Sequence, residues 1–199
     1  MYRITKGLDL PITGQPEQKI LPGPACTRAA LSSVDYNGMK PTMLVQEGDS
    51  VKVGQALFAD KKAEGVVYTS PAAGRVAAIN RGERRAFQTI EIEVQGTESV
   101  QLKALAERDF SQASRAAVTE VLAESGLWTS FRTRPFSKVP GVGSVPRSIF
   151  VQAIDTNPLS VDPRMVIHER EQDFQFGLQA LTKLTDGKVF LCRRPGTPL

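Results

Sequence analysis

Two glycine-punctuated segments in the first hundred residues most strongly constrain the fold of this 199-residue chain. Residues 47–57 read Glu-Gly-Asp-Ser-Val-Lys-Val-Gly-Gln-Ala-Leu, and residues 70–79 read Ser-Pro-Ala-Ala-Gly-Arg-Val-Ala-Ala-Ile. Apolar and polar residues alternate in the first segment, and Gly48, Gly54 and Gly74 stand where the backbone must reverse. Each segment therefore predicts a short strand, a glycine turn and a second short strand.

Two such halves in tandem predict a small flattened β barrel-sandwich, the fold used by biotinyl and lipoyl carrier modules. We assign this domain to residues 1–100, which are β-rich and punctuated by Gly and Pro. Residues 89–94 alternate cleanly between polar and apolar side chains, which predicts a half-buried strand. Two functions remain open at this point: a carrier that bears a cofactor, or the same scaffold serving another purpose.

A carrier would need a modified lysine between the two barrel halves. Residues 60–63, Asp-Lys-Lys-Ala, occupy that place, so Lys61 or Lys62 could be lipoylated or biotinylated. The methionines that flank a biotinylated lysine are absent, and the hairpin is longer than usual. We therefore expect two solvated lysines in a turn.

The composition is that of an ordinary globular protein, with 41% hydrophobic and 23% charged residues. No run approaches about 18 apolar residues, and the N-terminus lacks an apolar signal core, so we expect a cytoplasmic location. The net charge is +4, but the basic residues are scattered and no aromatic residues interleave with them for base stacking. This pattern argues against nucleic-acid binding and leaves open docking on an anionic partner or a membrane-embedded subunit.

Few residues are available for metal or redox chemistry. Cys26 and Cys192 fall in separate predicted domains, and we expect two free, buried thiols in a reducing compartment. His168 is the one histidine, and there is no Cys-x-x-Cys pair. Local motifs therefore supply no metal or iron–sulfur site.

The second half of the chain opens with a helix. After a polar connection over residues 101–109, Ser111 is the predicted first residue and Gly126 the stop signal. The apolar face of this helix carries Val118, Val121 and Leu122. We expect Leu127 and Trp128 to fold back on the helix end.

Beyond Pro146 the pattern changes to α/β. Residues 148–154 form an apolar run typical of a strand covered on both faces, and residues 188–192 form a second such strand. Between them, residues 169–185 predict a helix with one apolar face of Phe174, Leu178, Leu181 and Leu184. A parallel pair with a right-handed crossover follows. Because two parallel strands cannot bury themselves, we interpret residues 101–199 as a truncated Rossmann-like α/β domain of a longer protein, giving an α+β/α/β fold overall.

One loop alternates aromatic and basic side chains in a way that suits a flat ligand. It is residues 131–138, with Phe131, Arg132, Arg134, Phe136 and Lys138. Aromatic faces could stack on a ring while Arg or Lys donates to its carbonyl oxygens. Alternatively, the loop is a surface segment whose phenylalanines plug a domain interface, which is the commoner case.

Other candidate motifs are weaker. Residues 140–146 contain two glycines but match no phosphate-binding pattern, and they precede a strand rather than follow one. Asp155, Asn157 and Asp162 follow the first parallel strand, where open sheets bind ligands, but turn formation and capping explain them better. We expect His168 to be a surface or capping histidine.

Six motifs together resemble the N-terminal part of NqrA, a subunit family of the bacterial Na⁺-translocating NADH:quinone oxidoreductase (Na⁺-NQR). They are residues 4–12 (ITKGLDLPI), 47–58 (EGDSVKVGQALF), 60–62 (DKK), 78–83 (AINRGE), 125–140 (SGLWTSFRTRPFSKVP) and 155–158 (DTNP). The resemblance covers essentially the whole chain, and its last two motifs are specific.

The resemblance implies a peripheral subunit on the cytoplasmic side of the bacterial inner membrane. It would belong to a six-subunit respiratory sodium pump that oxidises NADH, reduces ubiquinone and exports Na⁺. The carriers FAD, FMN, riboflavin and a 2Fe-2S centre would reside on other subunits, and the isolated chain would be inactive. The NqrA subunit would contribute to the ubiquinone site where it meets the membrane subunit NqrB. A purely structural adaptor, or the RnfC subunit of the related Rnf-type complex, is the alternative.

The implied quinone contacts fall on two segments. One is residues 131–138, with the five aromatic and basic side chains named above. The other is residues 32–39, where Tyr36 and Met39 offer an aromatic face and a flexible apolar side chain. No residue is expected to act as a catalytic group.

The resemblance also implies where a flavin is missing. Related subunits of complex I and of the Rnf complex bind FMN with a glycine-rich loop after the helix that corresponds to residues 111–125. Here residues 128–135 place bulky side chains where a phosphate would need bare backbone. We therefore expect no flavin on this chain.

Overall fold

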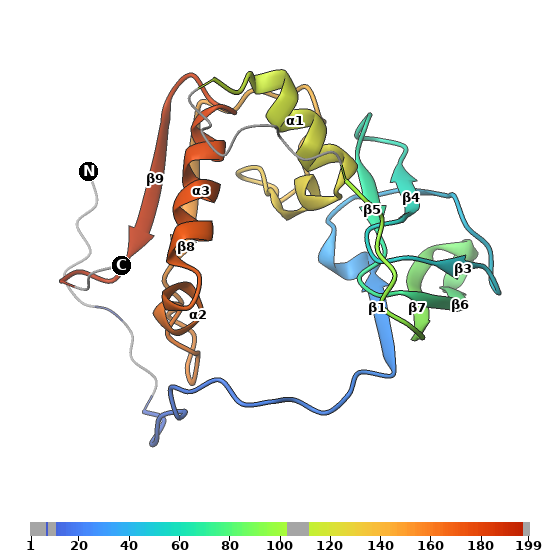
Figure 1. Ribbon diagram of the computed structural model, residues 1–199, viewed down its shortest axis with the longest axis horizontal. Helices are drawn as coiled ribbons and strands as arrows, with labels where there is room; N and C mark the ends of the chain where they lie inside the picture. Colours follow the sequence, from blue (N-terminus) through green and yellow to red (C-terminus); the bar gives the residue numbers. More distant parts are fainter. Residues whose placement is uncertain (1–6, 8–10, 103–111, 197–199) are drawn as a thin grey trace. The chain divides into compact units, whose positions relative to one another are not determined.

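The computed structural model describes residue 7 and residues 11–102 and 112–196. They fall into two units (Figure 1). One is residues 24–146, and the other combines residues 1–23 with residues 147–199.

Two antiparallel sheets form most of the unit of residues 24–146 (Figure 1). The first has the strand order β1-β7-β6-β3, with β1 Arg28–Ser32, β3 Ser50–Val51, β6 Gly74–Arg81 and β7 Phe87–Val94. The second has the order β2-β4-β5, with β2 Pro41–Met43, β4 Ala56–Asp60 and β5 Val67–Thr69. Short 3₁₀ turns η1 (Ser33–Asp35) and η2 (Glu83–Arg85) follow β1 and β6. This arrangement confirms the barrel-sandwich prediction.

The core lies between the two sheets. Leu57 and Phe58 of β4 and Ile90 and Ile92 of β7 are fully buried. Alternation along β7 therefore places its apolar side chains inward, as the period-two pattern predicted. The predicted reversals are also confirmed, because Gly48, Gly54 and Gly74 all have positive φ. At Gly74 the approach is so close that a Cβ atom would lie 1.9 Å from the carbonyl oxygen of Glu93 on β7.

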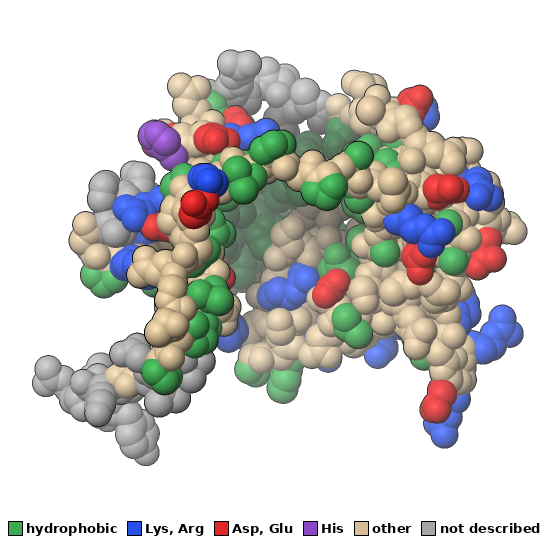
Figure 2. Space-filling model, turned by 90° about the horizontal axis from the view of Figure 1, so that it is seen from below, with side chains coloured by type: hydrophobic (Ala, Val, Ile, Leu, Met, Phe, Trp, Pro, Cys, Tyr) green, Lys and Arg blue, Asp and Glu red, His purple; other side chains and the backbone are tan. Residues whose placement is uncertain are grey.

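Charged side chains do not gather into one patch on the face of the molecule that Figure 2 presents. Over the barrel, on the right of that view, Lys and Arg lie interspersed with Asp and Glu (Figure 2). Two pairs across strands illustrate this mixing: Arg75 with Glu93 at 3.0 Å and Arg28 with Glu91 at 3.4 Å. A surface of this kind gives little support to nucleic-acid binding.

Helix α1 (Arg115–Glu124) belongs to the same unit. The predicted first residue, Ser111, lies outside the described residues, and Ser114 is the N-cap, accepting a hydrogen bond from the Ala117 amide at 3.2 Å. Gly126, with φ +75°, ends the helix as predicted. The turn η3 (Leu127–Ser130) then lies against α1 and buries Trp128, whereas Leu127 is 58% exposed.

The other unit contains a parallel pair, β8 (Ser148–Ala153) and β9 (Lys188–Arg193), as predicted. The helix predicted over residues 169–185 is α3 (Glu171–Thr182), and a short helix that was not predicted, α2 (Arg164–His168), precedes it. Arg170 interrupts them with a non-helical backbone. Helix α3 packs beside β9 (Figure 1), and Leu184 just after it is buried.

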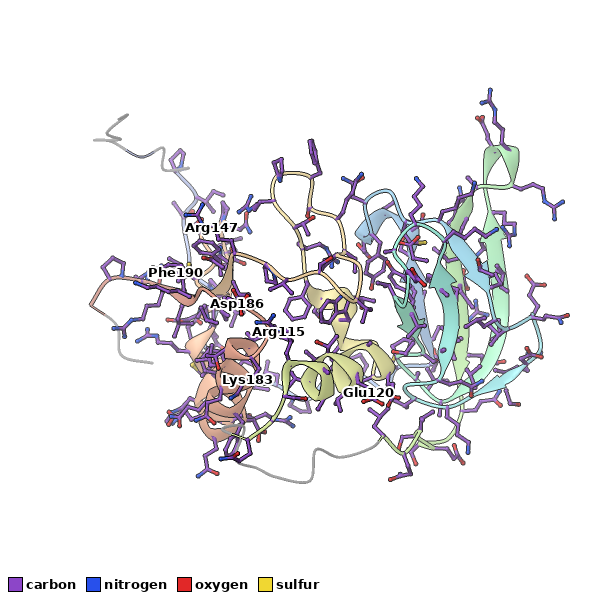
Figure 3. The ribbon with its side chains drawn as sticks, turned by 90° about the horizontal axis from the view of Figure 1, so that it is seen from above. Arg115, Glu120, Arg147, Lys183, Asp186 and Phe190 are labelled. Atoms are coloured by element: carbon purple, nitrogen blue, oxygen red, sulfur yellow. The ribbon has the colours of Figure 1, made fainter. Side chains whose placement is uncertain are left out.

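The expectation that β8 is covered on both faces was wrong for the described residues. The parallel register sets Phe150 opposite Phe190, and their rings stack at 5.0 Å with an interplanar angle of 13°. Phe150 is 61% exposed, and Phe190, labelled on β9 in Figure 3, is 42% exposed. Side chains that are paired across neighbouring strands lie on the same face of a sheet, so both rings lie on one face.

The cysteines also differ from expectation. Both are free, as predicted, but Cys26 is exposed and Cys192 is half-buried. We had inferred burial because free cysteines are usually buried. Cys26 differs because it lies in the segment before β1, where the neighbouring side chains are also exposed.

Candidate functional site

A small cavity of about 140 Å³ lies in the barrel unit, where three stretches of chain converge. Its lining residues are Tyr36, Asn37, Gly38, Met39, Asp60, Lys62, Ala63, Tyr68, Lys138 and Val139. The two segments that the sequence linked to a quinone, residues 32–39 and 131–138, therefore meet at one cavity. Tyr36, Met39 and Lys138 line it directly.

The aromatic wall of this cavity continues into the barrel core. Phe87 contacts Phe58 at 5.2 Å between ring centroids, and Phe58 stacks on Tyr68 at 4.6 Å and 16°. Tyr36 then meets Tyr68 edge-on, at 4.6 Å and 74°. Because Phe58 and Tyr68 are almost fully buried, the barrel core holds this wall in place.

Arg132 joins residues 131–138 to residues 35–36, which precede β2. Its guanidinium lies 5.2 Å from the centre of the Tyr36 ring, a cation–π contact. It also donates to the carbonyl oxygens of Asp35 at 3.1 Å and Phe131 at 2.9 Å, and to that of Thr129. A planar group with several donors suits this role because it can bind several acceptors at once.

The loop is further closed by its own hydrogen bonds. The Thr133 amide and hydroxyl both donate to the Lys138 carbonyl oxygen, at 2.8 and 3.0 Å. Asn37 donates from its side-chain amide to the Phe136 carbonyl oxygen at 2.7 Å. The backbone of the loop is thus fixed against residues 32–39.

Not all of the predicted residues face the cavity. Phe131 turns to the buried Trp128, with ring centroids 5.2 Å apart and planes at 73°. Phe136 is 68% exposed at the loop tip, and Arg134 is exposed as well. The structure therefore brings Tyr36, Met39 and Lys138 together in the cavity lining. Arg132 lies outside the lining but contacts the Tyr36 ring. The other predicted residues, Phe131, Arg134 and Phe136, are not part of the lining.

Several lining residues were not linked to a quinone by sequence reasoning, among them Asp60 and Tyr68. Tyr68 is 1% exposed, and its hydroxyl is the one buried side-chain polar atom without a hydrogen-bond partner in the described part of the chain. Burial, with the negative charge of Asp60 adding to it, raises the pKa of this hydroxyl well above its usual range. The available signal was a tyrosine at the one inward position of the short strand β5, where a polar hydroxyl needs a partner.

The lysines considered for carrier chemistry are exposed in the turn after β4. The Asp60 carboxylate organises this turn, accepting from the Lys62 amide at 2.9 Å and from the Lys40 amide at 3.1 Å. Exposure of Lys61 and Lys62 agrees with the expectation of solvated lysines. Lys62 also lines the cavity, so a second positive charge lies near Lys138.

The segment after α1 is packed rather than open. Trp128 donates from its indole nitrogen to the Pro140 carbonyl oxygen at 2.8 Å. The amides of Thr129 and Phe131 are used within the turn, donating to Gly126 and Trp128. A Cβ atom on Gly126 would lie 2.4 Å from Thr69 Oγ1 of the barrel. These backbone donors are therefore not turned toward a phosphate.

The other unit has a larger hollow of about 510 Å³ at the carboxyl ends of β8 and β9. Its polar residues bind one another: Asp155 Oδ1 accepts from the Asn157 amide and side chain, both at 2.8 Å. Asp162 accepts from the Arg164 side chain at 2.6 and 2.9 Å, and these hydrogen bonds hold the pKa of its carboxyl below the usual range. Asp155, Asn157 and Asp162 thus form turns, as the simpler interpretation predicted.

Neither a metal centre nor a catalytic histidine emerges from the described residues. They contain no group of three or more His, Cys, Asp or Glu side chains that could hold a metal ion. His168 ends α2 with an 84% exposed side chain and contacts Glu171 at 3.0 Å. This position fits the predicted surface histidine.

Comparison with protein families finds two matches. Residues 2–95 match the NqrA N-terminal barrel-sandwich hybrid domain, and residues 113–199 match the NqrA second alpha/beta domain. These descriptions agree with the two parts of the predicted fold.

Curated relatives give the same result. The chain is 57% identical over 196 residues to the NqrA subunit of the Na(+)-translocating NADH-quinone reductase from Saccharophagus degradans, and 55% identical over 199 residues to that from Marinomonas sp.. It is 53% identical over 196 residues to the corresponding subunit from Yersinia pestis. These alignments cover 98%, 100% and 98% of the chain, but the chain spans only 44% or 45% of each relative.

Proposed function

Since the chain belongs to the NqrA family of the Na⁺-translocating NADH-quinone reductase, we propose that it shapes part of a ubiquinone site in that reductase without carrying a flavin of its own. The reductase couples NADH oxidation and ubiquinone reduction to Na⁺ export. In this proposal the chain supplies binding surface, and the FAD, FMN, riboflavin and 2Fe-2S carriers lie on other subunits. The isolated chain would therefore be inactive.

The cavity between residues 36–39 and residues 138–139 is the observation that carries this proposal. It combines an aromatic edge from Tyr36, a flexible thioether from Met39 and positive charge from Lys138. A quinone ring needs apolar faces on both sides and donors at its two carbonyl oxygens. This cavity offers both residue types, apolar side chains and a donor, to one edge of such a ring.

Packing after α1 supports the absence of a flavin. Trp128 is buried there, and a Cβ atom on Gly126 would lie 2.4 Å from Thr69 Oγ1, so the turn that would have to hold an FMN phosphate in this proposal is filled by side chains. A phosphate site at this turn would need amide groups that point outward, and two of them are used inside the turn. The chain would therefore line a reaction site rather than transfer electrons.

The proposed location is the cytoplasmic side of the inner membrane, in contact with the membrane subunit NqrB. Among the described residues, no helix has both the length and the apolar character needed to cross a bilayer. In this proposal the chain reaches the membrane through its partner subunits. The exposed Phe136 at the tip of residues 131–138 is the side chain best placed to contact such a partner.

Photo-crosslinking tests the quinone proposal directly. A photoreactive ubiquinone applied to the assembled reductase should label residues 131–138 and residues 32–39 of the NqrA subunit. Excess unlabelled ubiquinone should suppress this labelling. Labelling confined to other subunits would refute the proposal.

A structural adaptor is the second candidate, and the exposure of Arg134 and Phe136 favours it. Both side chains lie outside the cavity lining, as residues that hold a neighbouring subunit would. Joint replacement Arg134→Ala and Phe136→Ala tests assembly, and joint replacement of the cavity residues Tyr36→Ala and Lys138→Ala tests the quinone site. Weaker assembly in the first variant together with unchanged quinone-reduction kinetics in the second would favour the adaptor.

A further inference from the structure

The hydroxyl of Tyr68 is buried without a hydrogen-bond partner at the wall of the 140 Å³ cavity. Nearly all buried polar groups in folded proteins are satisfied, so each exception needs an explanation. The surrounding residues do not supply the missing acceptor. Asp60 Oδ1, on the neighbouring strand β4, already accepts from two backbone amides, those of Lys40 and Lys62.

Packing fixes the direction of this hydroxyl. Phe58 stacks on one face of the Tyr68 ring, and Tyr36 meets the ring edge-on. The ring is 1% exposed and sits in the centre of β5. The hydroxyl is therefore held in a fixed position at the cavity wall. A ligand that binds there would not have to order this side chain, as it would a flexible one.

The protonation state of Tyr68 suits a donor. Burial and the nearby Asp60 both disfavour the phenolate, so the pKa is raised and the hydroxyl keeps its proton throughout the physiological range. A neutral phenol both donates and accepts, but a carbonyl oxygen can only accept. The complementary ligand group is thus an acceptor oxygen, and the negative charge of the nearby Asp60 favours an uncharged one.

We infer that Tyr68 donates a hydrogen bond to a carbonyl oxygen of the ligand that occupies this cavity, which is the ubiquinone ring if the proposed function holds. The volume of about 140 Å³ equals that of roughly four to five liquid water molecules, so the cavity admits a ring edge with one carbonyl group rather than a whole isoprenoid quinone. Tyr68 is thereby assigned as a binding residue that the two quinone-linked segments do not contain.

The variant Tyr68→Phe tests the first part of this inference in the 199-residue chain. It keeps the ring contacts with Phe58 and Tyr36 and removes only the hydroxyl. Because no described protein group bonds to the hydroxyl, we expect the melting temperature to stay the same or to rise. The variant Tyr68→Leu, which also removes the ring contacts, should lower it. A clear loss of stability in Tyr68→Phe would reveal an internal partner and would overturn the inference.

Binding is tested in the assembled reductase with a short-chain ubiquinone. Tyr68→Phe in the NqrA subunit should raise KM for this quinone about tenfold, which corresponds to about 1.4 kcal/mol. The maximal rate should change far less, since the hydroxyl positions the ring and does not transfer a proton. Equal KM values for the two proteins would overturn the inference.

A vibrational readout separates binding from mere structure. Hydrogen bonding lowers the stretching frequency of a carbonyl group, so ¹³C-labelled ubiquinone should show one lowered band in the unchanged complex. Tyr68→Phe should remove that lowering. Tyr36→Phe removes the hydroxyl of a half-buried residue at the same cavity and keeps its ring, and the lowered band should persist in this control. Persistence in both variants would overturn the inference.

Failure of this inference differs from failure of the proposed function. If photoreactive ubiquinone labels residues 32–39 and 131–138 but Tyr68→Phe changes neither KM nor the carbonyl band, only the role of Tyr68 is lost. If the unchanged complex shows no labelling of these segments, the ubiquinone site and the role of Tyr68 are both refuted.

Discussion

Arg132 is the residue that most directly joins the loop of residues 131–138 to the barrel. Its guanidinium contacts the Tyr36 ring and the carbonyl oxygens of Asp35, Thr129 and Phe131. Arg132→Ala should lower the free energy of unfolding by about 1–2 kcal/mol, a range that allows for solvent exposure of the side chain. Arg132→Lys should recover less than half of this loss because one ammonium group cannot reach the same acceptors. Urea denaturation provides the measurement.

The neighbouring Arg134→Ala is the matched control for this series. Arg134 is exposed in the same loop and has the same charge. We expect its replacement to change the free energy of unfolding by no more than about 0.5 kcal/mol. Equal effects at positions 132 and 134 would show that charge, rather than the contacts of Arg132, stabilises the loop.

Tyr68 predicts a pH dependence with a definite sign. The pKa of the Tyr68 hydroxyl is raised in the folded chain, whereas a tyrosine in the unfolded chain loses its proton at about pH 10. Above that pH the unfolded state binds fewer protons than the folded state, so stability falls as pH rises. The fall has a limiting slope of about 1.4 kcal/mol per pH unit for this group. Tyr68→Phe lacks this contribution, so the variant should gain stability relative to the unchanged chain above about pH 10.

Urea midpoints of the two proteins measured between about pH 8 and 11 would test this prediction. Other titrating groups are common to both proteins and cancel in the difference. A difference that stays constant over the whole range would mean that Tyr68 ionises as easily in the folded chain as in the unfolded one.

Among the elements, the turn into β6 depends on a close backbone approach at Gly74. A Cβ atom there would lie 1.9 Å from the Glu93 carbonyl oxygen, which is part of the β6–β7 pairing and cannot move aside. We expect Gly74→Ala to destabilise the chain by more than about 3 kcal/mol. Gly48→Ala is the control, since Gly48 has φ +92° but nothing within 4 Å of its would-be Cβ. It should cost only about 1–2 kcal/mol, from backbone strain alone.

Thermal unfolding of both variants measures this contrast. Similar losses at the two positions would mean that the positive φ, and not the contact with Glu93, requires glycine at Gly74.

Local patterns in the sequence were sufficient to predict the barrel elements. Glycines at Gly48, Gly54 and Gly74 and the alternation along β7 depend on neighbours in the chain, and the structure confirms them. Helix α2 was missed because its five residues are too few to show the apolar periodicity that predicts a helix. The exposed Phe150 was missed because an apolar run does not report how many sheet faces are covered.

The candidate site required information that no local pattern holds. Residues 36–39 and residues 138–139 are about a hundred positions apart, and their meeting at one cavity follows from how α1 and η3 return the chain to the barrel. The family resemblance linked the two segments, but it did not indicate Tyr68. A missing hydrogen bond can be recognised only when all of the neighbours of a side chain are known.

For the molecule as a whole, the compact units do not follow the order of the sequence. Residues 24–146 form one unit that includes α1, η3 and the loop of residues 131–138. The family matches divide the chain elsewhere, at residues 2–95 and 113–199. Stability experiments can show which division describes the cooperative folding unit.

Hydrogen bonds that cross the boundary between the two family matches, near residues 95–113, favour residues 24–146 as the cooperative folding unit. The Thr69 hydroxyl donates to the Ser125 carbonyl oxygen at 3.3 Å, and Arg132 donates to that of Asp35 at 3.1 Å. Asn37 donates to that of Phe136 at 2.7 Å. All three hydrogen bonds join the barrel to residues 125–136, so a barrel cut off after residue 102 would lose them together.

We therefore predict that a chain of residues 24–146 folds, and that a chain of residues 24–102 is less stable by at least about 2 kcal/mol. The longer chain contains Trp128, the one tryptophan of the sequence, whose buried ring should give the same blue-shifted emission as in the 199-residue chain. Urea unfolding followed by circular dichroism compares the two chains, because both contain the barrel strands. Equal midpoints would show that the barrel folds independently of α1 and the loop. The candidate site would then rest on a loop that contributes nothing to the stability of the barrel.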